Sequence, residues 1–152
     1  DDLAAARRLE GAAIAAALGA ILDRIAERRA EAEAAHAAQS ADAPRRLREK
    51  VAAVMESAPE IGEDRLAQEL ALIATRQDVR EELDRLSAHL EAARALLREG
   101  GAVGRRLDFL TQEFNREANT LCAKSASQAL TEAGLALKVL VDQLREQAAN
   151  LA

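Results

Sequence analysis

The residues most able to do chemistry in this chain are two glutamates at helical spacing. Glu113 and Glu117 are four positions apart, so their carboxylates project from the same side of a helix. Such a pair can bind a divalent cation, Mg²⁺ or Mn²⁺, while water and a substrate phosphate complete the coordination. Glu117 has no cation three or four positions away, so its charge is expected to be neutralised from outside its own helix.

A second polar stripe repeats this arrangement earlier in the chain. Asp78, Glu82, Arg85 and His89 follow one another at intervals of four, three and four residues. Histidine is the side chain best suited to proton transfer near neutral pH. A solvated charged face explains the same spacing and is favoured on the residues alone. His36 has no such neighbours and is expected at the surface.

Polar residues flank both sides of the apolar stripe in the segment 104–125. Phe114 lies at the centre of that stripe and is expected in the core. One flank could orient a polar substrate, and the other combines cations with carboxylates. Spacing alone favours structural hydrogen bonds and ion pairs over a site. The first flank holds Asp108, Gln112, Asn115 and Asn119, and the second holds Arg106, Glu113, Glu117 and Lys124.

Hydrophobic periodicity predicts that helices position these residues. Apolar residues recur every three or four positions over most of the chain. Pro44 is expected to start a new helix, and Gly100 with Gly101 to end one. The predicted helices cover residues 2–39, 44–56, 64–97, 107–121 and 130–151, with a joint at 125–127.

Composition agrees with an all-α fold and excludes several kinds of protein. Hydrophobic residues make up 49% and charged residues 31%, and the net charge is -5. The single Cys122 excludes an internal disulfide and a cysteine-rich zinc site. No apolar run is long enough for a membrane span, so a cytoplasmic protein without a membrane partner is expected. The sequence contains no glycine-rich phosphate loop and no aromatic platform for stacking bases.

The predicted helix lengths indicate an elongated molecule. About 36 residues of helix measure roughly 54 Å, whereas a compact globule of this size has a radius of gyration of about 15 Å. Two long helices should therefore project, and their apolar stripes should pair with a second copy. We expect an elongated, oligomeric bundle of about five helices. Residues 1–62 would form a helical linker, and residues 63–152 a C-terminal helical domain.

Three segments resemble the C-terminal part of the YicC/YloC family of bacterial endoribonucleases. The strongest runs from Arg-Arg-Leu-Asp-Phe at 105–109 to the block 113–121. The block 78–86 with His89 is similar to the family's other characteristic motif, and 137–140 with 143–147 to its last helix. The chain departs from the family at Cys122–Ala123 and at Ala126–Ser127, which affects the joint before the last helix.

This resemblance implies a cytoplasmic enzyme that cleaves single-stranded or structured RNA internally and acts as a ring-like or clamp-like homo-oligomer. Metal dependence is part of the same expectation. The family also has an N-terminal α/β domain, and because the chain opens on Asp1 rather than methionine, that domain is expected to precede it. Whether this segment is active alone stays open.

The leading hypothesis is metal-assisted hydrolysis of RNA phosphodiesters. The catalytic set would hold the ion and move a proton through His89, with Glu113 and Glu117 as the metal ligands. A second set would bind RNA phosphates and bases. The catalytic candidates are Glu82, His89, Asp108, Glu113 and Glu117, and the RNA-binding candidates are Arg85, Arg105, Arg106, Gln112, Asn115, Arg116, Asn119 and Lys124.

The opposing hypothesis is a non-catalytic helical scaffold that assembles an oligomer or binds RNA. Two arrangements of the acidic stripes would distinguish these hypotheses. Carboxylates that converge on one coordination sphere support catalysis. Carboxylates that are each buried against an arginine of a neighbouring helix support the scaffold.

Overall fold

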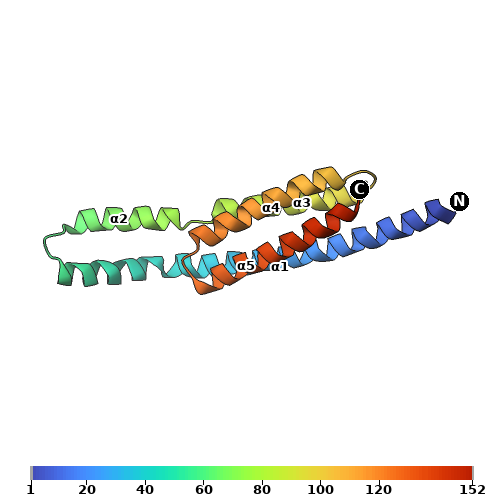
Figure 1. Ribbon diagram of the computed structural model, residues 1–152. Helices are drawn as coiled ribbons and strands as arrows, with labels where there is room; N and C mark the ends of the chain where they lie inside the picture. Colours follow the sequence, from blue (N-terminus) through green and yellow to red (C-terminus); the bar gives the residue numbers. More distant parts are fainter. Residues whose placement is uncertain (1, 152) are drawn as a thin grey trace.

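The computed structural model describes residues 2–151, apart from the side chain at position 3, and is helical almost throughout (Figure 1). Asp1 and Ala152, the outer ends of the two predicted segments, lie outside the described residues. Within 2–151 there is no strand, which confirms the all-α prediction. The elements are α1 (Asp2–Ser57), α2 (Glu63–Arg76), α3 (Arg80–Glu99), α4 (Gly104–Lys124), α5 (Gln128–Ala148) and the 3₁₀ helix η1 (Ala149–Leu151).

Four helices form the packed part of the molecule. The middle of α1 lies beside α5, α4 packs on α3 and α5, and η1 closes the end (Figure 1). Apolar residues at spacings of three and four turn one stripe of each helix inward. Fully buried side chains include Leu22 of α1, Leu86 of α3, Phe114 of α4 and Leu137 of α5. Phe114 is therefore core, as predicted.

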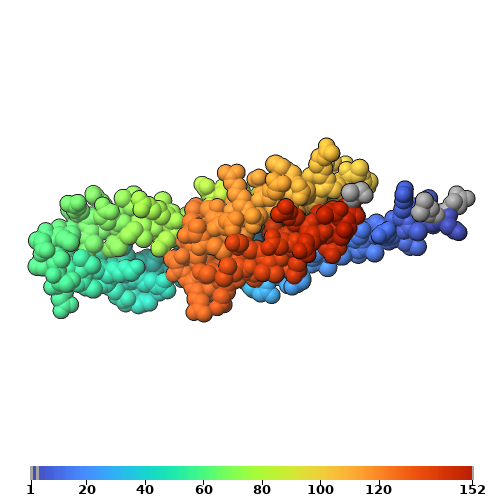
Figure 2. Space-filling view, in the orientation of Figure 1, coloured from blue at the N-terminus to red at the C-terminus, as the bar shows by residue number. Residues whose placement is uncertain are grey.

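The C-terminal part of α1 forms a hairpin with α2 that extends past the bundle, while the N-terminal end of α1 lies at the opposite end of the molecule (Figures 1 and 2). None of the residues of α2 is buried, and Leu72 and Ile73 are among the exposed large apolar side chains. In α1 no described residue after His36 is buried. The elongated shape predicted from the sequence is thus confirmed, and this hairpin accounts for much of the length.

The predicted break at Ser40–Pro44 is wrong, because α1 continues through Pro44 without interruption. Proline removes one backbone N–H donor from the helix interior and crowds the preceding turn. Asp42 offsets this locally: Oδ2 accepts hydrogen bonds from Arg45 and Arg46, each at 2.8 Å. Arg45 also donates to Glu49 at 2.6 Å, so ion pairs span the proline turn on both sides.

The predicted helix 64–97 is in fact two helices, separated at Gln77–Val79. Asp78 produces the break: its Oδ1 accepts a hydrogen bond from the backbone N–H of Arg80 at 2.9 Å, a local bond that competes with helix continuation. The same oxygen lies 3.2 Å from Nε2 of His36 on α1. His36 is 9% exposed, so the prediction of a surface histidine is also wrong.

The connections on either side of α4 follow the sequence. Gly100 and Gly101 adopt φ of 68° and 72°, in the left-handed region that favours glycine, and end α3 as predicted. At the predicted joint, Oγ of Ser127 accepts a hydrogen bond from the backbone N–H of Leu130 and caps α5. Gly134 of α5 lies so close to α4 that an added Cβ would meet Sγ of Cys122 at 2.6 Å.

Candidate metal centre

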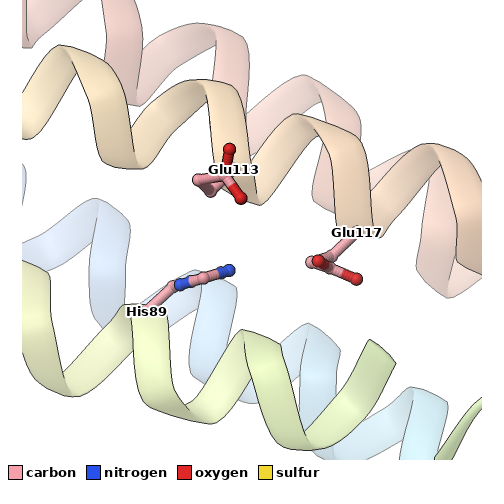
Figure 3. A group of neighbouring side chains, drawn as sticks. All are labelled: His89, Glu113 and Glu117. Carbon is pink, nitrogen blue, oxygen red and sulfur yellow. The ribbon is translucent and has the colours of Figure 1, made fainter. Parts of the chain in front are cut away.

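Three potential metal ligands converge in the seam between α3 and α4. His89 comes from α3, and Glu113 and Glu117 come from consecutive turns of α4 (Figure 3). One ligand atom from each lies within 4.8 Å of the others. Figure 3 shows the three side chains extending from facing helices into one space. The predicted pair of glutamates is therefore joined by the histidine of the second stripe.

Core packing fixes this arrangement. Phe114, which lies between the two glutamates in the sequence, is fully buried. Its ring contacts the His89 ring edge-on, with ring centroids 5.6 Å apart and ring planes at 73°. Such edge-to-face contacts are favoured for aromatic pairs. Leu86, on the same face of α3 as His89, and Leu90, the residue after it, are buried as well. The imidazole is thus held by the core on one side and faces the carboxylates on the other.

Glu117 pairs with a cation from another helix, Arg85 of α3, as the sequence predicted. Its Oε1 accepts a hydrogen bond from Nε of Arg85 on α3 at 2.8 Å. The glutamate side chain is 5% exposed, while that of Arg85 is 45% exposed. This hydrogen bond is the main cause that raises the pKa of Arg85. The pair links α3 to α4 at the edge of the group formed by His89, Glu113 and Glu117.

Glu82 extends the network away from solvent. Its Oε1 accepts hydrogen bonds from Nζ of Lys124 at 2.8 Å and from Nη2 of Arg85 at 3.2 Å. The side chain is 2% exposed, and its second oxygen has no hydrogen-bond partner among the described residues. Arg85 therefore contacts Glu82 and Glu117 at once. Two cations, Arg85 and Lys124, face three carboxylates, those of Glu82, Glu113 and Glu117. The net formal charge of these five groups is therefore negative.

The donor set fits a divalent cation. Nε2 of His89 is buried and has no hydrogen-bond partner within residues 2–151, although buried polar atoms are almost always bonded. One imidazole nitrogen and two carboxylates suit ions such as Mn²⁺ or Zn²⁺. Ligands about 2.0–2.2 Å from one ion lie at most about 4.4 Å apart, so small side-chain adjustments bring these atoms to bonding distance. Three protein ligands leave positions open for water and phosphate.

The other predicted site residues lie outside this cluster. Asp108 is exposed and accepts a hydrogen bond from Gln112 at 3.3 Å, on a face about 140° from Glu113 at about 100° per residue. Asp78 leaves the second stripe because it sits in the break before α3. Exposed on the surface of α4 are Arg105, Arg106, Gln112, Asn115, Arg116 and Asn119.

Two contacts of the network escape sequence reasoning. Lys124 and Arg85 hold Glu82 and Glu117, and RNA binding by these two residues stays a prediction. Arg106 likewise pairs with Glu99 at 2.7 Å. The spacing of Glu82 and Arg85 at three residues signalled their pair. The pairing across helices depends on the register of α3 against α4, which the spacing within one helix does not specify.

These features define an all-helical protein with a histidine–carboxylate cluster whose donor atoms lie within 4.8 Å of one another. Residues 30–152 match the family model described as "Endoribonuclease YicC-like, C-terminal". The chain belongs to this family, as its motifs indicated. No helix in the described part of the chain is long and apolar enough to cross a membrane.

Curated relatives carry the same family name. The chain is 53% identical over 87 residues to a protein of Haemophilus influenzae named "Probable endoribonuclease YicC". It is 32% identical over 110 residues to a protein of the same name from Clostridioides difficile. These alignments cover 57% and 72% of this chain, but only 30% and 38% of the relatives. The match thus spans about a third of each relative's length.

Proposed function

We propose that the seam between α3 and α4 is a metal-dependent centre for internal cleavage of RNA. The observation that carries the proposal is the convergence of His89, Glu113 and Glu117, with a buried imidazole nitrogen that has no other partner. The relatives' printed name, probable endoribonuclease, supports RNA as the substrate. A divalent cation in such a site makes bound water a better nucleophile and neutralises charge on a phosphate.

In this proposal the residues of the chain have distinct tasks. Glu113 and Glu117 hold the cation, and His89 acts as the third ligand rather than as the proton carrier expected from sequence. Arg85 neutralises Glu117 through the 2.8 Å hydrogen bond and competes with the cation for its carboxylate. The exposed guanidinium groups of Arg105 and Arg116 on α4 bind the RNA phosphates on either side of the scissile bond.

The alternative is a non-catalytic scaffold that assembles the protein or holds RNA. A specific observation favours it: Glu82 and Glu117 are each buried against a cation, and both networks link α3 to α4. Ion pairs of this kind specify helix register without any chemistry. The two functions differ in one respect, because only the metal centre requires His89 and Glu113 to act together with a cation.

A circular single-stranded RNA tests the proposal directly, because only internal cleavage linearises it. The chain is incubated with Mn²⁺, with Mg²⁺ or with chelator, and compared with Glu113→Gln and His89→Gln. We expect linear product with metal, none with chelator, and a loss of at least about a hundredfold in each variant, as for removal of other groups that stabilise transition-state charge.

Glu146→Gln, on the exposed face of α5, is the matched control and should cleave like the wild type. RNA that is bound but never linearised in any metal would support the scaffold. Equal cleavage in metal and in chelator would reject a metal centre.

A further inference from the structure

Phe109 is the only exposed aromatic side chain in the described part of the chain. The sequence has no Trp, no Tyr and two Phe; Phe114 is fully buried, whereas Phe109 is 61% exposed. The expectation that the chain offers no aromatic surface for bases thus does not hold for this ring. Exposing a phenyl ring forgoes the free energy of its burial, so the environment of this ring is informative.

The ring borders a surface groove of about 620 Å³ between α3 and α4. The α3 side is lined by two small residues, Ala92 and Ala95, together with Leu96 and Glu99. Two arginines, Arg105 and Arg106, line the α4 side. Because Arg106 pairs with Glu99 at 2.7 Å, the groove joins a planar apolar surface to one guanidinium group that is unpaired within residues 2–151, that of Arg105, a combination suited to a base together with its phosphate.

The groove continues the seam between α3 and α4 that contains His89, Glu113 and Glu117. Phe109 precedes Glu113 by four residues on α4, and Ala92 follows His89 by three residues on α3. One helical turn, about 5.4 Å, therefore separates the groove from the cluster on both helices. A polynucleotide lying along the seam would meet the cation ligands and the aromatic ring in succession.

We propose that Phe109 and Arg105 form a subsite that binds one unpaired nucleobase and its phosphate beside the cleavage centre. This inference rests on the proposed function and specifies its substrate as single-stranded RNA, since a base must leave its duplex stack to lie on a side chain. Phe109 provides the stacking face. Arg105, which has no ion pair among the described residues, binds the phosphate, whereas Arg106 is held by Glu99.

The charge of the groove favours RNA over a second copy of this chain. A stable protein interface buries about 800 Å² per partner around an apolar centre that is poor in charge. Here the apolar lining of Phe109 and four aliphatic residues is bordered by three charged side chains, of which Arg106 and Glu99 neutralise each other and Arg105 remains positive. Arg105 would lose water against a protein surface, but it gains a phosphate from RNA.

The test measures binding of a short single-stranded RNA that carries 2-aminopurine, with chelator present so that cleavage does not interfere. Phe109→Leu keeps the apolar bulk and removes the aromatic face. We expect its affinity to fall about 5- to 150-fold, the range of one lost base–aromatic stack, and the quenching of 2-aminopurine to disappear. Phe109→Trp should retain both.

A duplex of the same sequence should bind Phe109→Leu and wild type equally. Leu135→Ala, at a similarly exposed position of α5, is the matched control and should leave single-strand binding unchanged. Unchanged affinity in Phe109→Leu would overturn the proposal. Dissociation of an oligomer in Phe109→Leu, detected by sedimentation and accompanied by the loss of RNA affinity, would also overturn the proposal. The groove would then hold a second copy of the chain.

These outcomes are independent of the metal centre. If circular RNA is never cleaved but Phe109→Leu loses quenching, the base subsite stands and the catalytic proposal fails. If cleavage needs metal and Phe109→Leu binds normally, the subsite fails and the metal centre stands.

Discussion

Glu117 is the residue at which the structural and chemical demands on this site meet. Its carboxylate completes the candidate cation site with His89 and Glu113, and the same carboxylate is bonded to Arg85. A metal ion and the guanidinium group therefore compete for one buried charge. Substitutions on either side of this pair separate the structural contribution from metal binding.

Glu117→Gln is expected to lower stability even without metal. The change removes the shortest of the carboxylate contacts of Arg85, which keeps Glu82 at 3.2 Å, and hydrogen bonds to charged groups contribute about 1.5–3 kcal/mol. Relief of repulsion with Glu113 returns only about 0.2–0.5 kcal/mol. In thermal melts we expect a lower Tm with chelator and, in addition, loss of the rise in Tm that Mn²⁺ gives the wild type. Equal destabilisation with chelator and with Mn²⁺ would make Glu117 a purely structural residue.

Arg85→Gln should have the opposite effect on metal affinity. Removing a cation next to Glu117 takes away repulsion and competition, and unit charges about 4 Å apart interact by roughly 1–4 kcal/mol between water and a protein surface. We expect Mn²⁺ to bind about tenfold more tightly, measured by titration calorimetry in the absence of RNA. Arg116→Gln, an exposed position on α4, is the control and should change affinity less. Weaker binding in Arg85→Gln would show that Arg85 only orients the ligand.

In helix α1, ion pairs of Asp42, Arg45 and Glu49 surround the turn that contains Pro44. Arg45 and then Arg46 hold the pKa of Asp42 below its usual range through their hydrogen bonds. Since the folded pKa lies below the unfolded one, this stabilisation is present above about pH 4 and is lost as the pH falls through the folded value. The hairpin of α1 and α2, which lacks buried side chains, should therefore lose helicity first on acidification.

Circular dichroism during an acid titration measures this loss. Asp42→Asn should start with less helix at neutral pH and should lack the part of the acid transition that Asp42 contributes. Asp142→Asn, an exposed position on α5 with no ion pair among the described residues, should titrate like the wild type. Identical curves for all three proteins would remove Asp42 as the support of the Pro44 turn.

The same elements show which parts of the fold can be predicted from the spacing of apolar residues in the sequence. The helices around Leu107–Leu121 and Leu130–Leu151, and the end of α3 at Gly100, are local consequences of spacing and glycine. The path of α1 through Pro44 and the break at Asp78 depend on side-chain bonds that outweigh helix propensity. For the site, the Glu113–Glu117 pair could be read from one helix. His89 is assigned to the same site, as a proton carrier, from its type and the family resemblance. Its distance to the two carboxylates and the partner of Glu117 could not be predicted, because they depend on the packing register of α3 against α4.

At the scale of the whole molecule, the protein consists of a packed bundle and a thin extension. The bundle buries a continuous apolar core, and the candidate site lies in one of its seams. The hairpin of α1 and α2 instead exposes Leu72 at 54% and Ile73 at 43%. Two helices alone cover little apolar surface, so exposed residues of this kind favour association with another surface.

We predict that the other surface is the hairpin of a second copy, and that this self-association is measurable in solution. Sedimentation equilibrium at micromolar concentration should give a mass above the 16.3 kDa of one chain, because pairing of the hairpins would bury apolar side chains that no intramolecular element covers. The double substitution Leu72→Gln and Ile73→Gln should shift the mass towards that of one chain without changing the helicity of the bundle, while Leu135→Gln on α5 should leave it unchanged. A single-chain mass for the wild type would contradict self-association, and a frictional ratio near that of a sphere would contradict the extended hairpin itself.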